Sequence, residues 1–189
     1  MNNLGRNARE SISEVFLSLT RKKETCQLGI MSPQIDTHAE VLAVLNEVLK
    51  AELTALHQYL LHSKLCANWG YQRLAEHNHQ ESVEEMQHAE LLMDRILFLK
   101  GDPNMTDLSS IKNCASVKEQ IEWDLAFEKD AIDRLNAAIK TATEAGDNTT
   151  RQLFEKILLD EDRHVDYLEG QLHVISEIGI GNYLARQIE

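Results

Sequence analysis

The stretch ESVEEMQHAE, residues 81–90, contains the motif Glu-x-x-His at Glu85 and His88. Residues three apart share one face of an α-helix, so a helix here directs a carboxylate and an imidazole at the same point. The hydrophobic pattern around the motif places Glu85 on the buried side of that helix. A buried carboxylate is costly unless something neutralises it. Glu52 occupies an equivalent core position in the preceding helix.

The same arrangement recurs in the second half of the chain. There Glu128 precedes Glu161 by the same interval that separates Glu52 from Glu85, and Glu161 begins the motif that ends at His164. The chain therefore contains two matched halves at a constant offset, and these predict a pseudo-twofold repeat of a helix pair. One core glutamate could reflect a misread helical register, but four of them in four helices need a shared explanation.

A further copy of the motif, Glu76 with His79, acts as an internal control. It lies nine residues before Glu85, or about two and a half helical turns, so it points to the opposite face of the helix. The position equivalent to Glu76 in the second half holds Gln152, so this copy has no repeat partner. We interpret it as a solvated surface pair.

Four carboxylates and two imidazoles form a hard oxygen and nitrogen donor set, which suits iron, manganese or zinc. Two divalent cations would also neutralise the four carboxylates and remove the cost of burying them. The same donor set is known from di-iron and di-manganese helical bundles. The alternative is a set of surface glutamates with a misassigned register. The predicted metal ligands are Glu52, Glu85, His88, Glu128, Glu161 and His164.

The fold class that the pattern predicts is all-α: a four-helix bundle with one long crossover and a short fifth C-terminal helix. The capping pair Ser116 and Glu119 marks the start of the third helix, and Gly101 with Pro103 marks the end of the second. Short links join helices one to two and three to four, whereas residues 101–115 can cross the length of a bundle. The helices are expected at about 37–68, 71–100, 116–145, 149–178 and 182–188.

The composition disfavours several classes of binding partner and of structural site. The 189 residues have a formal net charge of −12, which disfavours nucleic acid and acidic membrane surfaces. No long, unbroken apolar run predicts a transmembrane helix. The three cysteines, Cys26, Cys66 and Cys114, form no CxxC pair, so we expect neither a disulfide framework nor a zinc finger. This usage favours a cytoplasmic location.

From about Ala39 to Ile188 the chain resembles the bacterioferritins, the haem-containing branch of the ferritin family. Together the shared stretches are highly specific, and they need no gap between the motifs. The stretches are AEL at 51–53, QY at 58–59, NWG at 68–70, ESVEEMQHA at 81–89, RILFL at 95–99, DLAFE at 124–128, DEDRH at 160–164 and NYL at 182–184.

The resemblance implies a ferritin-like bundle that assembles into a homo-oligomeric cage of 24 subunits with a mineral cavity. It implies a ferroxidase centre that takes up ferrous iron and dioxygen and binds two iron ions per subunit. Glu85 and Glu161 would bridge the two ions, Glu52 and Glu128 would each hold one, and each histidine would complete one site. Tyr59 lies two turns after Glu52 on the same face, so it is expected either to serve the centre, through a hydrogen bond or one-electron redox chemistry, or to pack as an ordinary core aromatic residue.

Met86 directly follows Glu85 and so points about 100° away from the predicted metal site. With Val83, Met93 and Leu97 it forms a second apolar patch, which from the residues alone indicates packing at a subunit interface. The resemblance implies instead that Met86 is an axial ligand of haem b, with one haem per subunit pair on a twofold axis. A ferredoxin-type reductant would then supply electrons for iron release.

Two regions depart from the family pattern. Gln80 and Glu84 stand where relatives often carry a histidine and an aspartate, which puts an inner-surface iron site in doubt unless His77 or His79 compensates. Residues 1–35 lie outside the resemblance and are expected to form a flexible N-terminal extension, with residues 36–189 as the ferritin-like di-iron domain. A targeting or docking helix, or a translation start nearer Met31, stays open for the extension.

Other function classes remain as alternatives. A di-iron oxygenase or peroxidase that stores nothing would need a substrate cavity, and a rubrerythrin would carry a CxxC module, which is absent from the sequence. A haem electron carrier would not need the complete ligand set. A DNA-protecting mini-ferritin would place its metal between subunits. The intact set therefore favours an iron storage protein with ferroxidase activity.

Overall fold

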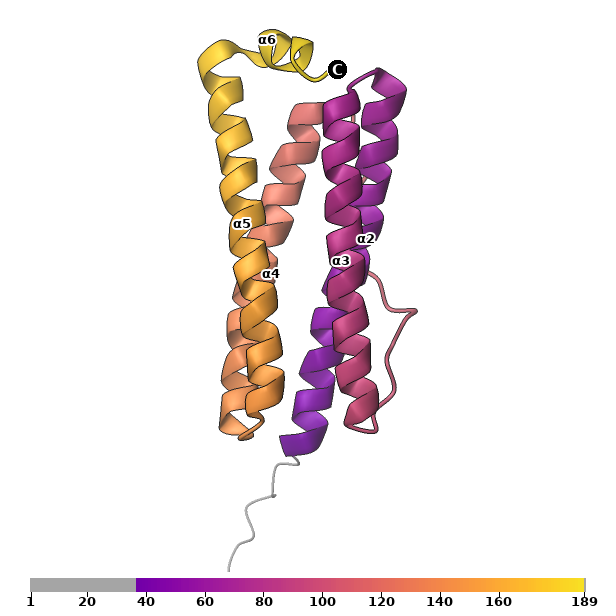
Figure 1. Cartoon of the computed structure of the whole chain (residues 1–189), viewed down its shortest axis with the longest axis vertical. Helices are drawn as coiled ribbons and strands as arrows, with labels where there is room; N and C mark the ends of the chain where they lie inside the picture. Colours follow the sequence, from indigo (N-terminus) through magenta and orange to yellow (C-terminus); the bar gives the residue numbers. More distant parts are fainter. Residues whose placement is uncertain (1–36, 189) are drawn as a thin grey trace, which may run out of the picture. The chain divides into compact units, whose positions relative to one another are not determined.

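The computed structural model describes residues 37–188, which form five helices and contain no strand (Figure 1). The predicted all-α class, with four long helices and a short fifth, is confirmed. The N-terminal extension predicted for residues 1–35 lies outside the described residues. The elements are α2 (Thr37–Trp69), α3 (Gln72–Phe98), α4 (Val117–Glu144), α5 (Asn148–Ile178) and α6 (Ile180–Ala185).

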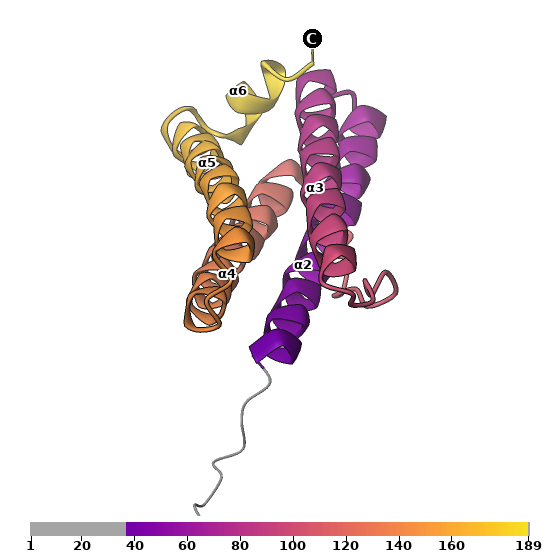
Figure 2. The same cartoon turned by 60° about the horizontal axis from the view of Figure 1, so that its bottom comes forward.

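The four long helices form two antiparallel pairs, α2 with α3 and α4 with α5 (Figure 1). Each pair turns at a glycine, Gly70 or Gly146, whose positive φ of 86° or 72° suits a residue without a Cβ. The long connection after α3 makes α4 run in the same direction as α3, as a single crossover requires. Helix α6 lies across one end of the bundle (Figures 1 and 2).

The crossover is attached along α2 by a ladder of hydrogen bonds. Three side-chain oxygens of α2 each accept a hydrogen bond from a backbone N–H group of the crossover. The pairs are Asn46 with Asn104 at 2.8 Å, Thr54 with Ser109 at 3.0 Å, and Gln58 with Lys112 at 2.8 Å. The three acceptors follow one another along α2 in the same order as the three donors along the crossover, so the segment rises along the bundle in an extended path. This attachment confirms that the connection between the two hairpins spans the bundle length.

Two hydrophobic clusters fill the two ends of the bundle. The larger contains Leu45, Leu92 and Ile157, all fully buried, and the smaller lies toward α6 and contains Cys66 and Tyr183. On α3, α4 and α5 the metal-binding candidates lie between the residues of one cluster and those of the other, and on α2 Glu52 lies at the edge of the larger cluster, beside Leu53. The apolar ends therefore hold the four helices at a fixed separation around a polar middle.

Helix boundaries depart slightly from the sequence pattern. Ser116 caps α4 as predicted, because its hydroxyl accepts the N–H of Glu119 at 3.2 Å. Helix α5 begins at Asn148, one residue before the approximate start predicted at Thr149, because Asp147 is the cap and accepts the N–H of Thr150 at 3.0 Å. Asp147 is also bound by Arg95, which fixes this turn against α3. The C-terminal helix likewise begins earlier than expected, at Ile180.

No helix within residues 37–188 has the length and apolar content that crossing a membrane requires.

Candidate metal centre

Each long helix contributes one buried glutamate to the middle of the bundle. Glu52 of α2, Glu85 of α3, Glu128 of α4 and Glu161 of α5 are all at most 2% exposed. They lie among the turns that separate the two hydrophobic clusters, so their carboxylates have little access to water. His88 and His164, three residues after Glu85 and Glu161, are buried beside them.

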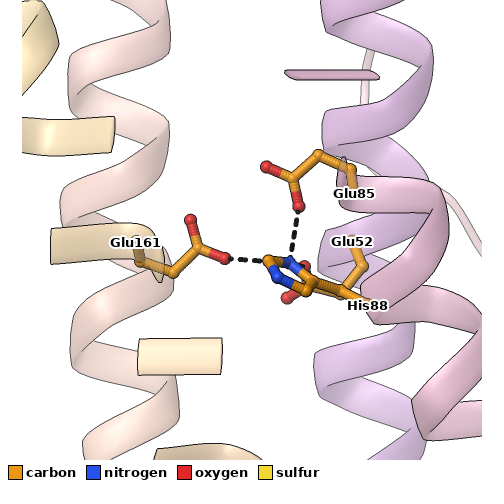
Figure 3. A group of neighbouring side chains, drawn as sticks. All are labelled: Glu52, Glu85, His88 and Glu161. Carbon is orange, nitrogen blue, oxygen red and sulfur yellow. Dashed lines mark hydrogen bonds and ion pairs between the residues drawn. The ribbon is translucent and has the colours of Figure 1, made fainter. Parts of the chain in front are cut away.

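The first half of the centre consists of Glu52 and His88 together with one oxygen from each of Glu85 and Glu161. His88 Nδ1 lies 3.2 Å from Glu52 Oε2 and 3.2 Å from Glu85 Oε2. It also lies 3.6 Å from Glu161 Oε1, which reaches across from α5 (Figure 3). The four residues offer donor atoms that all lie within 4.8 Å of one another. This spacing is compatible with a single bound cation.

The second half consists of Glu128 and His164 with the other oxygens of the same two glutamates. His164 Nδ1 lies 3.0 Å from Glu161 Oε2 and 3.5 Å from Glu85 Oε1. Glu128 Oε1 is 3.9 Å from the same nitrogen. Glu85 and Glu161 thus each turn one oxygen to the first half and one to the second. Two carboxylates placed in this way are suited to bridge two cations.

The electrostatics show that the centre is crowded with negative charge. Burial and the charges of Glu161 and Glu52 hold the pKa of Glu85 well above its usual value, and its Oε1 has no hydrogen-bond partner. Burial and Glu161 likewise raise the pKa of Glu128. Two divalent cations would satisfy these groups, because cations favour the ionised carboxylate.

At the contact between Glu161 and His164 the pKa of the carboxyl group is lowered and the pKa of the imidazole is raised. Burial works to raise the pKa of Glu161, but the hydrogen bond and positive charge of His164 outweigh it and lower that pKa. Burial works to lower the pKa of His164, but its hydrogen bond to Glu161 and the nearby carboxylate of Glu81 raise it to about 11. This imidazole therefore carries a proton that an incoming metal ion must displace.

Tyr59 lies beside the second half. It is 3% exposed, and its hydroxyl donates a hydrogen bond to Glu128 Oε1. Its ring is edge-on to His164, with the ring centres 6.5 Å apart. Burial and the charge of Glu128 raise the pKa of the phenol, so it stays protonated and keeps donating. The expected approach to the centre is observed, whereas a redox role stays a prediction.

The structure also identifies polar neighbours that the sequence reading missed. Asp160 Oδ2 lies 3.2 Å from His88 Nε2, and Glu81 Oε2 lies 2.9 Å from His164 Nε2. Both contacts are on the ring nitrogen that faces away from the cluster. A signal for Asp160 was present, because it stands immediately before Glu161 as Glu84 stands before Glu85.

A second buried polar network lies one turn along the bundle toward α6. The imidazole of His62 is fully buried and lies 2.9 Å from Asp124. Gln58 contacts the same ring at 2.7 Å and binds the crossover at Lys112. The network therefore connects α2, α4 and the crossover, and it had no distinct motif in the sequence.

The remaining candidates lie outside the centre. Met86 is 42% exposed on α3, as expected for a residue turned away from Glu85. Within the predicted apolar patch Leu97 is also exposed, whereas Met93 packs partly against the larger hydrophobic cluster. Gln80 and His79 are exposed, whereas His77 stacks on Tyr167 with ring centres 3.9 Å apart. The contact holds the His77 ring against α5.

Comparison with known proteins supplies the family. A model of the ferritin-like domain matches residues 42–178. A bacterioferritin from Mycolicibacterium paratuberculosis is 50% identical over 147 residues, which cover 78% of this chain and 92% of the relative. The bacterioferritin of Streptomyces coelicolor is 46% identical over 150 residues, covering 79% and 90%. That of Brucella melitensis is 41% identical over 144 residues, covering 76% and 89%.

The family match at residues 42–178 includes every glutamate and histidine of the buried cluster. The match and the relatives agree with the all-helical bundle and with the resemblance found in the sequence motifs. The chain therefore belongs to the ferritin family and, within it, to the bacterioferritins.

Proposed function

We propose that this chain stores iron and oxidises ferrous iron at the buried centre between its four long helices. The observation that carries the proposal is the placement of Glu85 and Glu161, each with one oxygen toward His88 and one toward His164. Two ferrous ions would be the substrates, one in each half. Glu52 and His88 complete the first position, and Glu128 and His164 complete the second.

The chemistry of the donors fits iron. Four carboxylates balance the charge of two divalent ions, and two imidazoles add nitrogen ligands of intermediate softness. The carboxylate oxygen of Glu85 that lacks a hydrogen-bond partner would gain a ligand bond. Hydrophobic residues on both sides keep the ions from bulk water, and Tyr59 fixes the orientation of Glu128.

The proposed reaction is a two-electron oxidation. Two ferrous ions lose one electron each, and one dioxygen molecule accepts both electrons with two protons to become hydrogen peroxide. The chain holds the two ions side by side, so that both electrons are available to one dioxygen molecule, and its four carboxylates balance the charge of the two ferrous ions. The ferric product then passes into storage or remains bound until it is replaced.

The storage and haem functions are further parts of the proposal. Resemblance to the bacterioferritins supports a homo-oligomer of 24 subunits that encloses a mineral. Met86 has an exposed thioether on α3, so it is available to a group outside its own subunit. Two such residues, one from each of two subunits, would hold one haem b per subunit pair, and the haem would supply electron transfer for iron release. A ferredoxin-type reductant is the proposed source of the electrons.

Two rival functions can be separated from storage by one experiment. The size of the purified assembly is measured first, and the assembly is then titrated aerobically with ferrous iron. The visible spectrum is recorded during the titration, and the iron that stays with the protein after desalting is measured. The proposal predicts oxidation that is fast up to two ions per subunit, followed by retention of many more. A non-storage oxygenase or peroxidase would oxidise two ions and retain no excess. A haem electron carrier would show haem bands without fast oxidation, and either result would contradict the proposal.

A further inference from the structure

Asp160 stands immediately before Glu161 on α5, and its carboxylate contacts His88 of α3. Asp160 Oδ2 lies 3.2 Å from His88 Nε2, while Oδ1 pairs with Arg163. The carboxylate is 15% exposed, and the histidine is 3% exposed. His88 is therefore held at both ring nitrogens, by the glutamate cluster at Nδ1 and by Asp160 at Nε2.

The two nitrogens of His88 need different protonation states for metal binding. A neutral imidazole carries one N–H and one bare nitrogen. Nδ1 faces Glu52 and Glu85 at 3.2 Å, so it must be bare to serve as a ligand in the first half. The proton then belongs on Nε2, where the Asp160 carboxylate accepts it in a hydrogen bond. A carboxylate at this position favours the tautomer that binds metal and fixes the plane of the ring.

We infer that Asp160 is a positioning residue for the first half of the metal centre, acting through His88. This inference rests on the proposed di-metal function. Asp160 does not join the ligand cluster around His88 Nδ1. Its contribution is to orient the imidazole, so that Nδ1 offers its lone pair to the ion shared with Glu52, Glu85 and Glu161.

The second half is supported differently, which provides an internal control. Glu84 occupies the repeat position of Asp160, since it stands immediately before Glu85. Its Oε2 lies 3.6 Å from His164 Nε2, beyond hydrogen-bond range, whereas Glu81 lies at 2.9 Å. The repeat position of Glu81 holds Ile157, a core residue, so this support has no equivalent beside His88. Loss of Asp160 should therefore matter more than loss of Glu84.

The test is an anaerobic titration of the metal-free assembly with Co²⁺, followed by its visible ligand-field bands. Wild-type protein should bind two ions per subunit. Asp160→Ala should weaken one of them by about 10- to 100-fold, as loss of a hydrogen-bonded partner of a histidine ligand does. The Co²⁺ affinity of Asp160→Asn should fall between those of wild type and Asp160→Ala, because the amide oxygen can still accept a hydrogen bond from the Nε2–H of His88. Asp162→Asn removes the same charge from an exposed site on α5 and should match wild type.

Two further comparisons assign the effect to His88. Glu84→Gln should weaken cobalt binding less than Asp160→Ala does, because Glu81 remains 2.9 Å from His164. In a His88→Ala background, adding Asp160→Ala should cause no further loss, since a positioning residue acts only through its partner. In Co²⁺-loaded wild type the Nε2 proton should also give a strongly shifted exchangeable proton resonance. It should exchange faster with water in Asp160→Asn, an effect that a general loss of stability does not produce.

The outcomes separate the inference from the function on which it rests. Wild-type protein that fails to bind two Co²⁺ ions per subunit would overturn the di-metal proposal itself. Wild type that binds two ions, with Asp160→Ala and Asp160→Asn equal to Asp162→Asn, would overturn the positioning role and leave the di-metal proposal intact. If Asp160→Ala does not assemble, Asp160→Asn alone decides, through its affinity and its proton exchange rate.

Discussion

The two halves of the metal centre share Glu85 and Glu161 but differ in what surrounds each histidine. In the first half, the far nitrogen of His88 is bound by Asp160. In the second half, the far nitrogen of His164 faces two carboxylates, and Tyr59 donates a hydrogen bond to Glu128. The repeat has therefore kept the ligands while their support has diverged. We expect the two bound ions to differ in affinity and in reactivity.

The sequence explains this difference. The repeat position of Tyr59 holds Leu135, and the repeat position of Glu81 holds Ile157. Both are buried in the larger hydrophobic cluster. Tyr59 and Glu81 thus provide polar groups beside the second half. At the two equivalent positions of the repeat the side chains are aliphatic.

The largest effect should come from changing a residue that both halves use. Glu85→Gln and Glu161→Gln each remove a bridging charge while keeping side-chain volume, so both variants should lose fast ferrous oxidation by more than about 100-fold. Stopped-flow absorbance after mixing with aerobic ferrous iron measures this rate. Full activity in both variants would contradict the shared role of the two glutamates.

The same pair should differ in the stability of the metal-free protein. The pKa of Glu85 is raised by burial, so its charge is unfavourable and Glu85→Gln should raise the melting temperature. The pKa of Glu161 is lowered by His164 despite burial, so its charge is favourable and Glu161→Gln should lower the melting temperature. Calorimetry of the metal-free proteins at neutral pH checks the sign of each change.

Changing one histidine should abolish metal binding in one half of the centre and leave it in the other. His88→Ala and His164→Ala should each leave one Zn²⁺ ion per subunit, and zinc should inhibit oxidation in wild type because it fits the ligands without redox chemistry. Metal binding in the second half should release the proton of His164, and binding in the first half should not. The hydrogen bond to Glu161 and the nearby carboxylate of Glu81 raise the pKa of His164 to about 11 against the effect of burial. Titration calorimetry in buffers of different ionisation enthalpy counts the protons released.

The raised pKa of His164 has a consequence for stability with a definite sign. Protonated His164 stabilises the metal-free fold fully below its unfolded pKa of about 6.5, and this contribution is lost as the pH rises toward about 11. The stability difference between wild type and His164→Gln should therefore shrink over that range. A difference that grows with pH would show that the ring is neutral in the metal-free protein.

A smaller effect is expected from Tyr59→Phe, which removes the hydrogen bond to Glu128 and keeps the ring. Oxidation should slow by about tenfold, with both metal sites still filled, because the phenol orients a ligand without binding the ion. Tyr183→Phe, near α6, is the matched control, since its hydroxyl binds Gln171 far along the chain from the ligands. Equal rates for the two variants would assign Tyr59 to packing alone.

The smallest effect on iron uptake should come from Met86→Ala. Met86 is exposed and points away from the buried glutamates, so oxidation should stay within about twofold of wild type while the haem bands disappear. The visible spectrum of the purified protein measures the haem, and release of iron under a reductant should slow. Full haem bands after the change would refute the ligand assignment and make Met93 the next candidate.

Much of the fold, and the grouping of the six candidate ligands, could be predicted from the sequence. Helical periodicity indicates the four long helices, and the constant offset between the two halves singles out the four glutamates and two histidines that the structure brings together. Contacts between helices were harder to predict. Asp160 contacts a histidine 72 residues away, and His62 pairs with Asp124 across 62 residues, so neither contact follows from local spacing. Packing geometry, absent from a one-dimensional pattern, decides which polar neighbour supports each ligand.

The central claim is that two glutamates bridge two iron ions. Crystals of the assembled protein, soaked anaerobically in ferrous iron and measured at the iron absorption edge, test it directly. The account predicts two anomalous peaks in each subunit, one among Glu52, His88 and the bridging pair, the other among Glu128, His164 and the same pair. A single peak, or two peaks that share neither Glu85 nor Glu161, would contradict it.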